Sequence, residues 1–333
     1  MTTNNEWDQL KTAIVGKADD AIIPPMDISL RLIDYPDIRS TRLKAKAIFD
    51  MGIKGGSFPQ QVLDEANEDL ETLVEFLKDQ GVNVLRTDIS VKPKYHYLSP
   101  RHSVFTIGNK AIAAPMALSM REDEYQSLTH ALQSKELIVA PRPDRKNLYN
   151  LEAFIDLHKH RVLNETAPVF DAANLLKCND DIYYMVSRTG NLKGAEYLQS
   201  ILPDKKIHLF ESLPNHTHIN SNIILLREGL CLVNSDRIRD LTMLPPNLQK
   251  WDKIIVPRLY DIGKFEGYKM ASPWICMNIL SVNPKLVILE QHQNVLRKLI
   301  EKHGIEVAML PMRHSKTLGI GFHNAVLDLD RIN

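Results

Sequence analysis

The sequence lacks any long apolar run and any excess of one charge. No apolar stretch approaches the ~18 residues that a membrane-spanning helix needs, and the first residues, MTTNNEWDQL, have neither the basic start nor the apolar stretch of a secretory signal. Lysine plus arginine and aspartate plus glutamate both total 41, so the chain has no basic field to hold a nucleic acid backbone. We therefore expect a cytoplasmic protein that binds neither a membrane nor nucleic acid.

Cysteine is scarce, and no flexible linker is apparent. Cys178, Cys231 and Cys276 are an odd number, are widely spaced and form no CxxC pair, which excludes a disulfide framework and a cysteine-based zinc site. No Ser/Gly-rich or low-complexity tract divides the 333 residues, of which 44% are apolar and 25% charged. This composition predicts one globular domain spanning residues 1–333.

A unit of strand, tight turn, strand, helix and strand recurs along the chain. One copy reads VFTIGNKAIAAP, then REDEYQSLTHALQ, then ELIVAP. Its Gly108-Asn109 pair is a strong hairpin signal, and Tyr125, Leu128 and Leu132 fall on one helical face. Three further copies begin with VFDAANLLKCNDDIYYMVS, NIILLREGLCLVN and WICMNILSVNPKLVILE. The copies start roughly 55 to 65 residues apart, which points to a repeat architecture.

A fifth unit can be assembled from both ends of the chain. It combines TAIVG, the helix around residues 61–79, NVLRT and the last strand AVLDLD. Five such ββαβ units predict an α/β fold, a five-bladed α/β propeller around a central site, whose closure removes exposed sheet edges. A doubly wound open sheet is the alternative, but the turns between paired strands are too short for its parallel crossovers.

Four stretches resemble the glycine amidinotransferase family, and the similarity covers nearly the whole chain. They read NEWDQLKTAIVGKADDAIIPP, APVFDAANLL, PNHTHINSNIILLREGLCLVNSDR and TLGIGFHNAVLDLDR. The resemblance implies a five-bladed α/β propeller, the pentein fold, with a buried central site. It also implies transfer of an amidino group from arginine to an amine through a covalent amidino-cysteine, without a cofactor, by proteins that are often homodimers.

The resemblance also implies site residues. Asp171 stands where the family has its catalytic aspartate and His218 where it has its histidine, a pair in which the carboxylate orients the imidazole and the imidazole moves the proton. Asn215, Arg237 and Ser272 match family positions too. Arg237 resembles the residue that holds a substrate carboxylate, for which a forked guanidinium is well suited.

The pattern breaks at three positions. The family's nucleophilic cysteine follows a Phe-His pair, where this chain has Asn324, which has no accessible anionic form. The two family acids that bind the arginine guanidinium appear as Asn220 and His102. An engineered Cys→Asn exchange would not explain these two. The site thus loses up to about three negative charges, so we expect it to prefer a neutral or anionic small molecule, with His102 able to add positive charge.

The cysteines and two glycines are expected to have structural roles only. Cys231 and Cys276 lie in apolar runs read as strands and are expected in the core, while Cys178 is expected to be exposed at a hairpin turn. The glycines Gly319 and Gly321 lack the rest of a phosphate-binding motif and are expected to permit a turn. No metal is expected, because paired cysteine or glutamate ligands do not accompany the neighbouring histidines. These histidines are His102, His216, His218 and His323.

Three functions remain open. The first is a divergent enzyme that uses Asp171 and His218 on a small amino-acid-like substrate, without a cysteine adduct, in specialised metabolism. Asn324 then either fills the cysteine's space or orients the substrate through its amide. The second is an inactive homologue that binds a ligand or a protein. The third is a true arginine-dependent amidinotransferase that uses an unfamiliar route.

Overall fold

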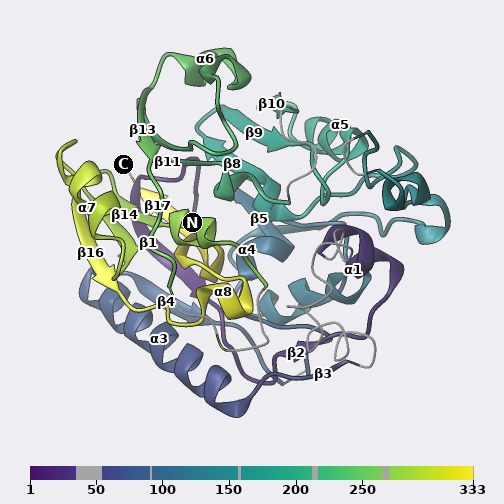
Figure 1. Cartoon of the computed structure of the whole chain (residues 1–333), viewed down its shortest axis with the longest axis horizontal. Coiled ribbons are helices and arrows are strands. Elements are labelled where there is room, and N and C mark those ends of the chain that lie inside the picture. Colours follow the sequence, from purple (N-terminus) through teal and green to yellow (C-terminus); the bar gives the residue numbers. More distant parts are fainter. Residues whose placement is uncertain are drawn as a thin grey trace.

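The computed structural model describes residues 1–34, 55–90, 92–156, 159–211, 217–262, 265 and 270–332. The chain has an α/β fold (Figure 1). The described residues form five three-stranded sheets of one design and one two-stranded sheet. In each three-stranded sheet the middle strand pairs antiparallel with one neighbour and parallel with the other. In four of the five sheets the antiparallel pair is joined by a short turn, and in all five the parallel pair is joined by a longer crossover, as parallel strands require.

The first sheet draws its strands from both ends of the chain, because Val15 pairs with Val326 and Gln9 with Ile332. The sheets, in strand order, are β17 (Val326–Ile332), β1 (Gln9–Val15) and β4 (Asn83–Arg86); β5 (Val104–Ile107), β6 (Lys110–Ala113) and β7 (Glu136–Val139); β8 (Leu175–Cys178), β9 (Asp181–Met185) and β10 (Lys206–Phe210); β11 (Ile223–Arg227), β12 (Leu230–Asn234) and β13 (Asp252–Val256); β14 (Leu280–Asn283), β15 (Leu286–Glu290) and β16 (Glu306–Leu310); and the short pair β2 (Ile22–Ile23) and β3 (Gly56–Ser57).

Helices occupy the crossovers between the second and third strands. They are α3 (Gln60–Asp79), α5 (Leu192–Ile201), α7 (Asn294–Glu301) and the shorter η7 (Leu241–Met243) and α6 (Pro246–Gln249). Other helices and turns are α1 (Ile28–Ile33), η3 (Arg145–Asn147), η4 (Leu151–Phe154) and α8 (Ser315–Leu318). In Figure 1, α3 and α7 lie at the outer edge of the molecule, away from its middle.

One predicted helix is wrong in type. The REDEYQSLTHALQ segment begins at the last residue of the 3-10 turn η1 (Ser119–Arg121) and contains a second such turn, η2 (Glu124–Leu128), in place of an α-helix. The hydroxyl of Ser127 donates to the carbonyl of Glu124, and that of Thr129 donates to the carbonyl of Gln126. Such hydroxyl bonds compete with the regular helical pattern and favour tight turns.

Buried apolar clusters join each sheet to the sheets before and after it. The strand β15 illustrates how, because alternate residues of a strand point to opposite faces. Val287 and Leu289 pack in the cluster shared with β11 and β12, whereas Leu286 and Ile288 pack in the cluster shared with β1. The two faces of one strand thus stabilise two different interfaces.

A short helical turn precedes the first strand of each sheet. The turns are α9 (Phe322–Ala325) before β17, α4 (Pro100–Ser103) before β5, η5 (Ala172–Asn174) before β8, η6 (Ile219–Ser221) before β11 and η8 (Pro273–Met277) before β14. In the order α9, α4, η5, η6, η8, each turn contacts the next. The backbone N–H of His323 in α9 donates to the carbonyl of Asn278, directly after η8, at 3.1 Å. Segments far apart in the chain are therefore gathered at one place.

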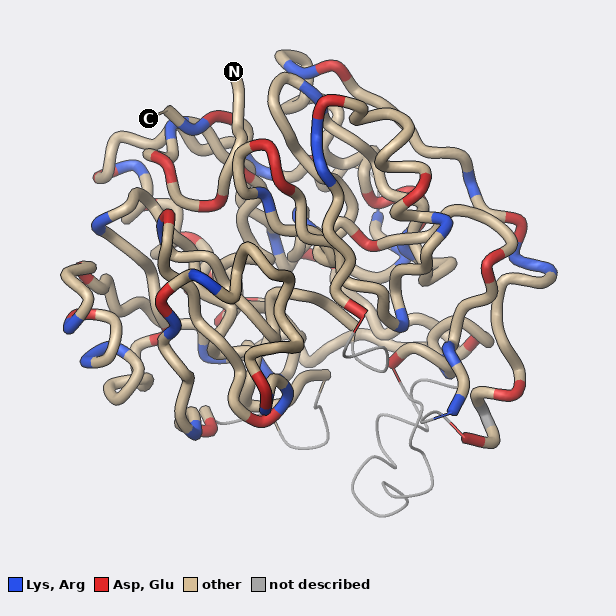
Figure 2. The backbone as a smooth tube through the Cα atoms, turned by 90° about the horizontal axis from the view of Figure 1, so that it is seen from above, with Lys and Arg blue, Asp and Glu red and all other residues tan. Residues whose placement is uncertain are grey.

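Charged residues of both signs are interspersed along the described chain (Figure 2), in agreement with the equal totals of 41. None of the helices in the described ranges is long and apolar enough to span a membrane.

Candidate active site

The five turns surround a cavity of about 270 Å³. Sequence-predicted site residues from all five turns and their flanks line it: His102, Asp171, His218, Asn220, Arg237, Ser272 and Asn324. The remaining predicted residue, Asn215, and the neighbouring His216 lie outside the described residues. Positions separated by more than 200 residues in the chain thus meet because all of these residues except Arg237, which follows β12, lie at or beside the turn that opens a sheet.

Asp171 and His218 form a hydrogen-bonded pair. Nε2 of His218 lies 2.9 Å from Oδ2 of Asp171, and Asp171 is buried, with 1% of its surface exposed. The backbone N–H of Asp171 donates to the carbonyl of Thr189 at 2.9 Å, and the carbonyl of His218 accepts from the Ser221 hydroxyl at 2.9 Å. Because Nε2 is engaged by the carboxylate, Nδ1 is the ring nitrogen available to a ligand.

Asn324 lies at the floor of the cavity, beside Asn220. Nδ2 of Asn220 donates to Oδ1 of Asn324 at 2.6 Å, and the backbone N–H of Asn324 donates to Oδ1 of Asn278 at 2.9 Å. Gly321 allows this close approach, because a Cβ on it would lie 2.5 Å from Cβ of Asn278. Gly319 has φ of +68°, a conformation that glycine adopts at little cost. Both glycines therefore serve the turn, as the sequence suggested.

His102 lines the cavity as a neutral side chain, contrary to the expectation that it could add positive charge. Its ring packs on that of His218, with centroids 4.4 Å apart. Burial, together with the nearby His218 and Arg121, lowers its pKa well below the ordinary value. Nη1 of Arg121 donates to Nδ1 of His102 at 2.6 Å, so the proton of the neutral ring lies on Nε2.

Arg121 and Glu124 are a buried pair that sequence reasoning missed. Nη2 of Arg121 lies 2.7 Å from Oε2 of Glu124, and Arg121 also lines the cavity. Burial raises the pKa of Glu124 to about 7, although Arg121 opposes the rise. The two residues lie in the REDEY segment, where their separation of three residues was the one available signal.

Arg237 is held at one end and points into the cavity. Its Nη1 donates to the hydroxyl of Ser221 at 2.6 Å and to Oδ1 of Asn222 at 3.2 Å. Burial and the neighbouring Arg188 lower its pKa to about 10, so it stays charged at neutral pH. Arg188 lines the same cavity and was not predicted. Two guanidinium groups in one wall favour a negatively charged group of a ligand.

Asp34 adds to the cavity a carboxylate that no sequence motif predicted. It follows α1 and lines the cavity, with its side chain exposed to that space but enclosed by protein around it. These surroundings disfavour its charged form and raise its pKa to about 6, while His218 and Arg121 oppose the rise. The cavity therefore carries charges of both signs.

The three cysteines lie away from the cavity lining, and all are buried. Cys231 lies in β12 as predicted. Cys178 was expected to be exposed, but it ends β8 and packs with Tyr183 and Trp7. Cys276 was expected in a strand, but Pro273 opens the 3-10 turn η8 there. Burial raises the pKa of Cys178 and Cys231 to about 12, so neither is a reactive thiol. The described residues contain no group of three or more histidine, cysteine, aspartate or glutamate side chains able to hold a metal ion.

Comparison with known proteins identifies the family. No protein-family model matches the chain. An inosamine-phosphate amidinotransferase of Streptomyces glaucescens is 37% identical over 350 residues, covering 99% of this chain and 97% of the relative. The mitochondrial glycine amidinotransferase of Xenopus tropicalis is 29% identical, covering 98% of this chain and 82% of the relative. The solved structure of an amidinotransferase of the saxitoxin biosynthetic pathway from Microseira wollei, 26% identical, superposes with a TM-score of 0.89 and covers 100% of this chain and 98% of that one. The chain belongs to the amidinotransferase family.

Proposed function

We propose that this protein is an amidinotransferase-family enzyme that acts on a small, amino-acid-like substrate by acid–base chemistry, without a covalent cysteine adduct. The observation that carries the proposal is the Asp171–His218 hydrogen bond in a cavity whose floor holds Asn324. The family's nucleophilic cysteine has no counterpart at Asn324, and each cysteine of this chain is buried elsewhere.

In this mechanism His218 is the base. A reacting C–H, O–H or N–H group of the substrate, or a water molecule in a hydrolysis, gives its proton to Nδ1 of His218, and the Asp171 carboxylate stabilises the imidazolium that forms. The proton then returns to the leaving group, so the step is balanced within the site. A reaction of this kind is an elimination, a cyclisation or a hydrolysis. Asn324 orients the substrate through its amide.

The charges in the cavity favour a zwitterion. Arg188 and Arg237 suit a carboxylate, and Asp34 suits an ammonium group. A volume of about 270 Å³ admits a molecule the size of an amino acid. The names of the relatives include inosamine phosphate, glycine and the saxitoxin biosynthetic pathway, which supports a small-molecule substrate and a role in biosynthesis. No cofactor is required in this mechanism.

We further infer that the five sheets are blades of one closed five-bladed propeller, a single domain with the cavity at its centre. The shared apolar clusters between successive sheets and the contacts between successive turns support this arrangement. A cytoplasmic location and a homodimer stay predictions.

A second candidate is arginine-dependent amidino transfer by an unfamiliar route. The sequence argued against it because two acids are replaced at His102 and Asn220. Asp34 partly restores negative charge in the cavity and, with Asp171, offers carboxylates to a guanidinium. The inactive, ligand-binding homologue is the third candidate.

Ornithine release separates the first two candidates. The natural chain and Asn324→Cys are incubated with arginine and with glycine or lysine as acceptor, and ornithine is measured. Release by the natural chain supports the second candidate and overturns the first. If the natural chain releases no ornithine and Asn324→Cys does, only the nucleophile is missing for transfer.

The role of His218 is tested on a panel of amino-acid derivatives, with products detected by mass spectrometry. His218→Ala should lower turnover by roughly 10²- to 10⁴-fold while the circular dichroism spectrum is unchanged. His208→Ala is the matched control, since His208 also pairs with an aspartate, Asp181 at 2.6 Å, but does not line the cavity. Equal turnover by His218→Ala and the natural chain would overturn the role of His218 as the base. No turnover on any substrate, with ligand binding retained, would favour the inactive homologue.

A further inference from the structure

A chain of four buried side chains ends at the floor of the cavity. Nε2 of His323 lies 3.1 Å from Oε2 of Glu6, and Nδ1 of His323 lies 3.1 Å from Nδ2 of Asn220. Nδ2 of Asn220 then lies 2.6 Å from Oδ1 of Asn324. Which way each amide points is decided by which atoms in this chain donate and which accept.

Glu6 determines which partner donates in its hydrogen bond with His323. It forms an ion pair with Arg101, and the backbone N–H of Lys177 donates to its Oε1 at 2.9 Å. Burial alone would raise its pKa, but Arg101 and Lys177 hold the pKa well below the usual range. An ionised carboxylate only accepts hydrogen bonds, so Nε2 of His323 is the donor.

The position of the proton on His323 in turn orients the amides of Asn220 and Asn324. Burial lowers its pKa to about 4, so the ring is neutral at pH 7 and its Nδ1 accepts. Asn220 must then turn its NH2 group toward His323, and the same group also donates to Oδ1 of Asn324. Both hydrogens of that NH2 group are used inside the protein. The carbonyl oxygen of Asn220 is consequently left to face the other way.

Asn220 in turn sets the orientation of Asn324. Because the NH2 group of Asn220 donates to Oδ1 of Asn324, the oxygen of Asn324 faces Asn220. The NH2 group of Asn324 is then left to face the cavity that both asparagines line.

We propose that the cavity floor recognises a neutral, planar ureido or carboxamide group, whose oxygen accepts from Nδ2 of Asn324 and whose NH2 donates to Oδ1 of Asn220, with Glu6 and His323 as positioning residues. This inference rests on the proposed function, because it names the head group of the amino-acid-like substrate. A guanidinium has donors only, so it would place an NH2 group against the NH2 of Asn324. A buried donor without a partner should weaken arginine binding by roughly 10-fold or more.

The proposal is tested by titration calorimetry with L-citrulline and L-arginine, which share a backbone and differ in the head group. The natural chain should bind L-citrulline at least about 10-fold more tightly than L-arginine. In Asn220→Asp a carboxylate replaces the donating amide, and the preference should move toward L-arginine by a similar factor. Asn109→Asp, at the exposed β5–β6 turn, makes the same exchange away from the cavity and should leave the preference unchanged.

The positioning role has a spectroscopic readout. In the protein with ¹⁵N-labelled histidine, assigned through His323→Gln, His323 should show the neutral form with its proton on Nε2 at pH 7. A proton on Nδ1 there, or a charged ring, would overturn the orientation of the amides. In Glu6→Gln the amide can offer either its oxygen or its NH2 group, so both neutral forms of His323 should appear and the citrulline preference should fall.

The outcomes separate this inference from the proposed function. Turnover that depends on His218, together with a preference for L-arginine or no binding of L-citrulline at millimolar concentration, overturns the head-group inference alone. A preference for L-citrulline without any His218-dependent turnover overturns the proposed function alone.

Discussion

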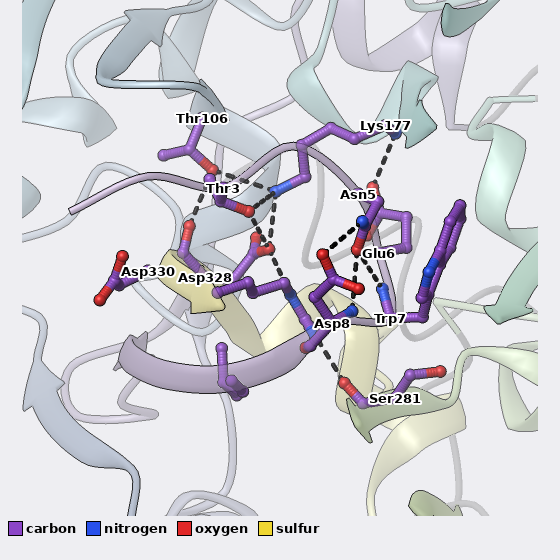
Figure 3. A network of polar contacts seen from close by, with 12 residues as sticks. Thr3, Asn5, Glu6, Trp7, Asp8, Thr106, Lys177, Ser281, Asp328 and Asp330 are labelled. Carbon is purple, nitrogen blue, oxygen red and sulfur yellow. Dashed lines mark hydrogen bonds and ion pairs between the residues drawn. The ribbon is translucent and has the colours of Figure 1, made fainter. Parts of the chain in front are cut away.

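The stability of this protein should depend strongly on one buried carboxylate, Asp328. Its Oδ2 accepts from the hydroxyl of Thr3 at 2.8 Å, from Nζ of Lys177 at 2.6 Å and from Nε of Arg331 at 2.7 Å (Figure 3). Oδ1 lies 3.4 Å from Nη2 of Arg101. The carboxylate thus joins the N-terminal segment, β8, α4 and the last strand. Lys177 and Asp328 are each 1% exposed at the side chain.

Asp328→Asn keeps the shape of the side chain but removes its charge. Lys177 and Arg331 would then lose the carboxylate with which each forms an ion pair, whereas Arg101 would keep Glu6. Removing one partner of a buried ion pair costs about 3–5 kcal/mol, because the other charge stays buried without compensation. We therefore expect the free energy of unfolding to fall by about 4 kcal/mol.

Lys177→Met is the matched comparison. It removes one of the three cations, and Asp328 keeps Arg331 and Arg101 as partners. Replacing a buried charge by an apolar chain of similar length should cost only about 1 kcal/mol. The two variants therefore differ in whether a buried charge is left without a partner.

Thermal and urea unfolding followed by circular dichroism measure both effects. An unfolding entropy of about 2.1 cal/mol/K per residue predicts roughly 0.7 kcal/mol/K for this chain, so Asp328→Asn should lower Tm by about 6 °C and Lys177→Met by one or two. The cations hold the pKa of Asp328 well below its ordinary value despite burial. Its stabilising effect is present above the unfolded pKa and is lost as pH falls, so the Asp328→Asn deficit should shrink below about pH 4. An equal or larger loss in Lys177→Met would refute the reasoning.

Two further predictions concern the site. The pKa of Asp34 is raised to about 6 in the native state. Between the ordinary carboxyl pKa and a pH of about 6, the native state therefore holds a proton that the unfolded state has lost. At higher pH the ionised Asp34 lowers the stability of the native state. Asp34→Asn should therefore raise Tm at pH 8 and leave it unchanged below the ordinary carboxyl pKa; the same Tm difference at both pH values would contradict this. Gly321→Ala places Cβ 2.5 Å from Cβ of Asn278, so the segment that carries Asn324 must shift. It should destabilise the chain by about 1–3 kcal/mol in urea unfolding, and an unchanged midpoint would show that the site has room.

Local pattern was sufficient to predict much of the strand framework. The Gly108-Asn109 turn and the apolar runs around it specify β5 and β6 through short-range backbone preferences alone. Motif resemblance located Asp171, His218, Asn220 and Asn324, and the structure places all four at the same cavity. Where local signals were ambiguous the prediction failed. Hydroxyl groups favour 3-10 turns in the REDEY segment, where an α-helix was predicted. Cys178, at the end of a hairpin, was predicted to be exposed but is buried.

The sequence by itself determined most of the strands and the turns between them, and the motif resemblance pointed to Asn324 and other residues of the cavity, because these depend on neighbours along the chain. Tertiary structure alone decided that Asp34 and Arg188 enter the cavity, that His102 is neutral, and that Glu6 reaches Asn324 through His323. The reason is physical: a pKa and an amide orientation depend on burial and on partners up to 317 residues away, and spacing along the chain carries no information about such partners.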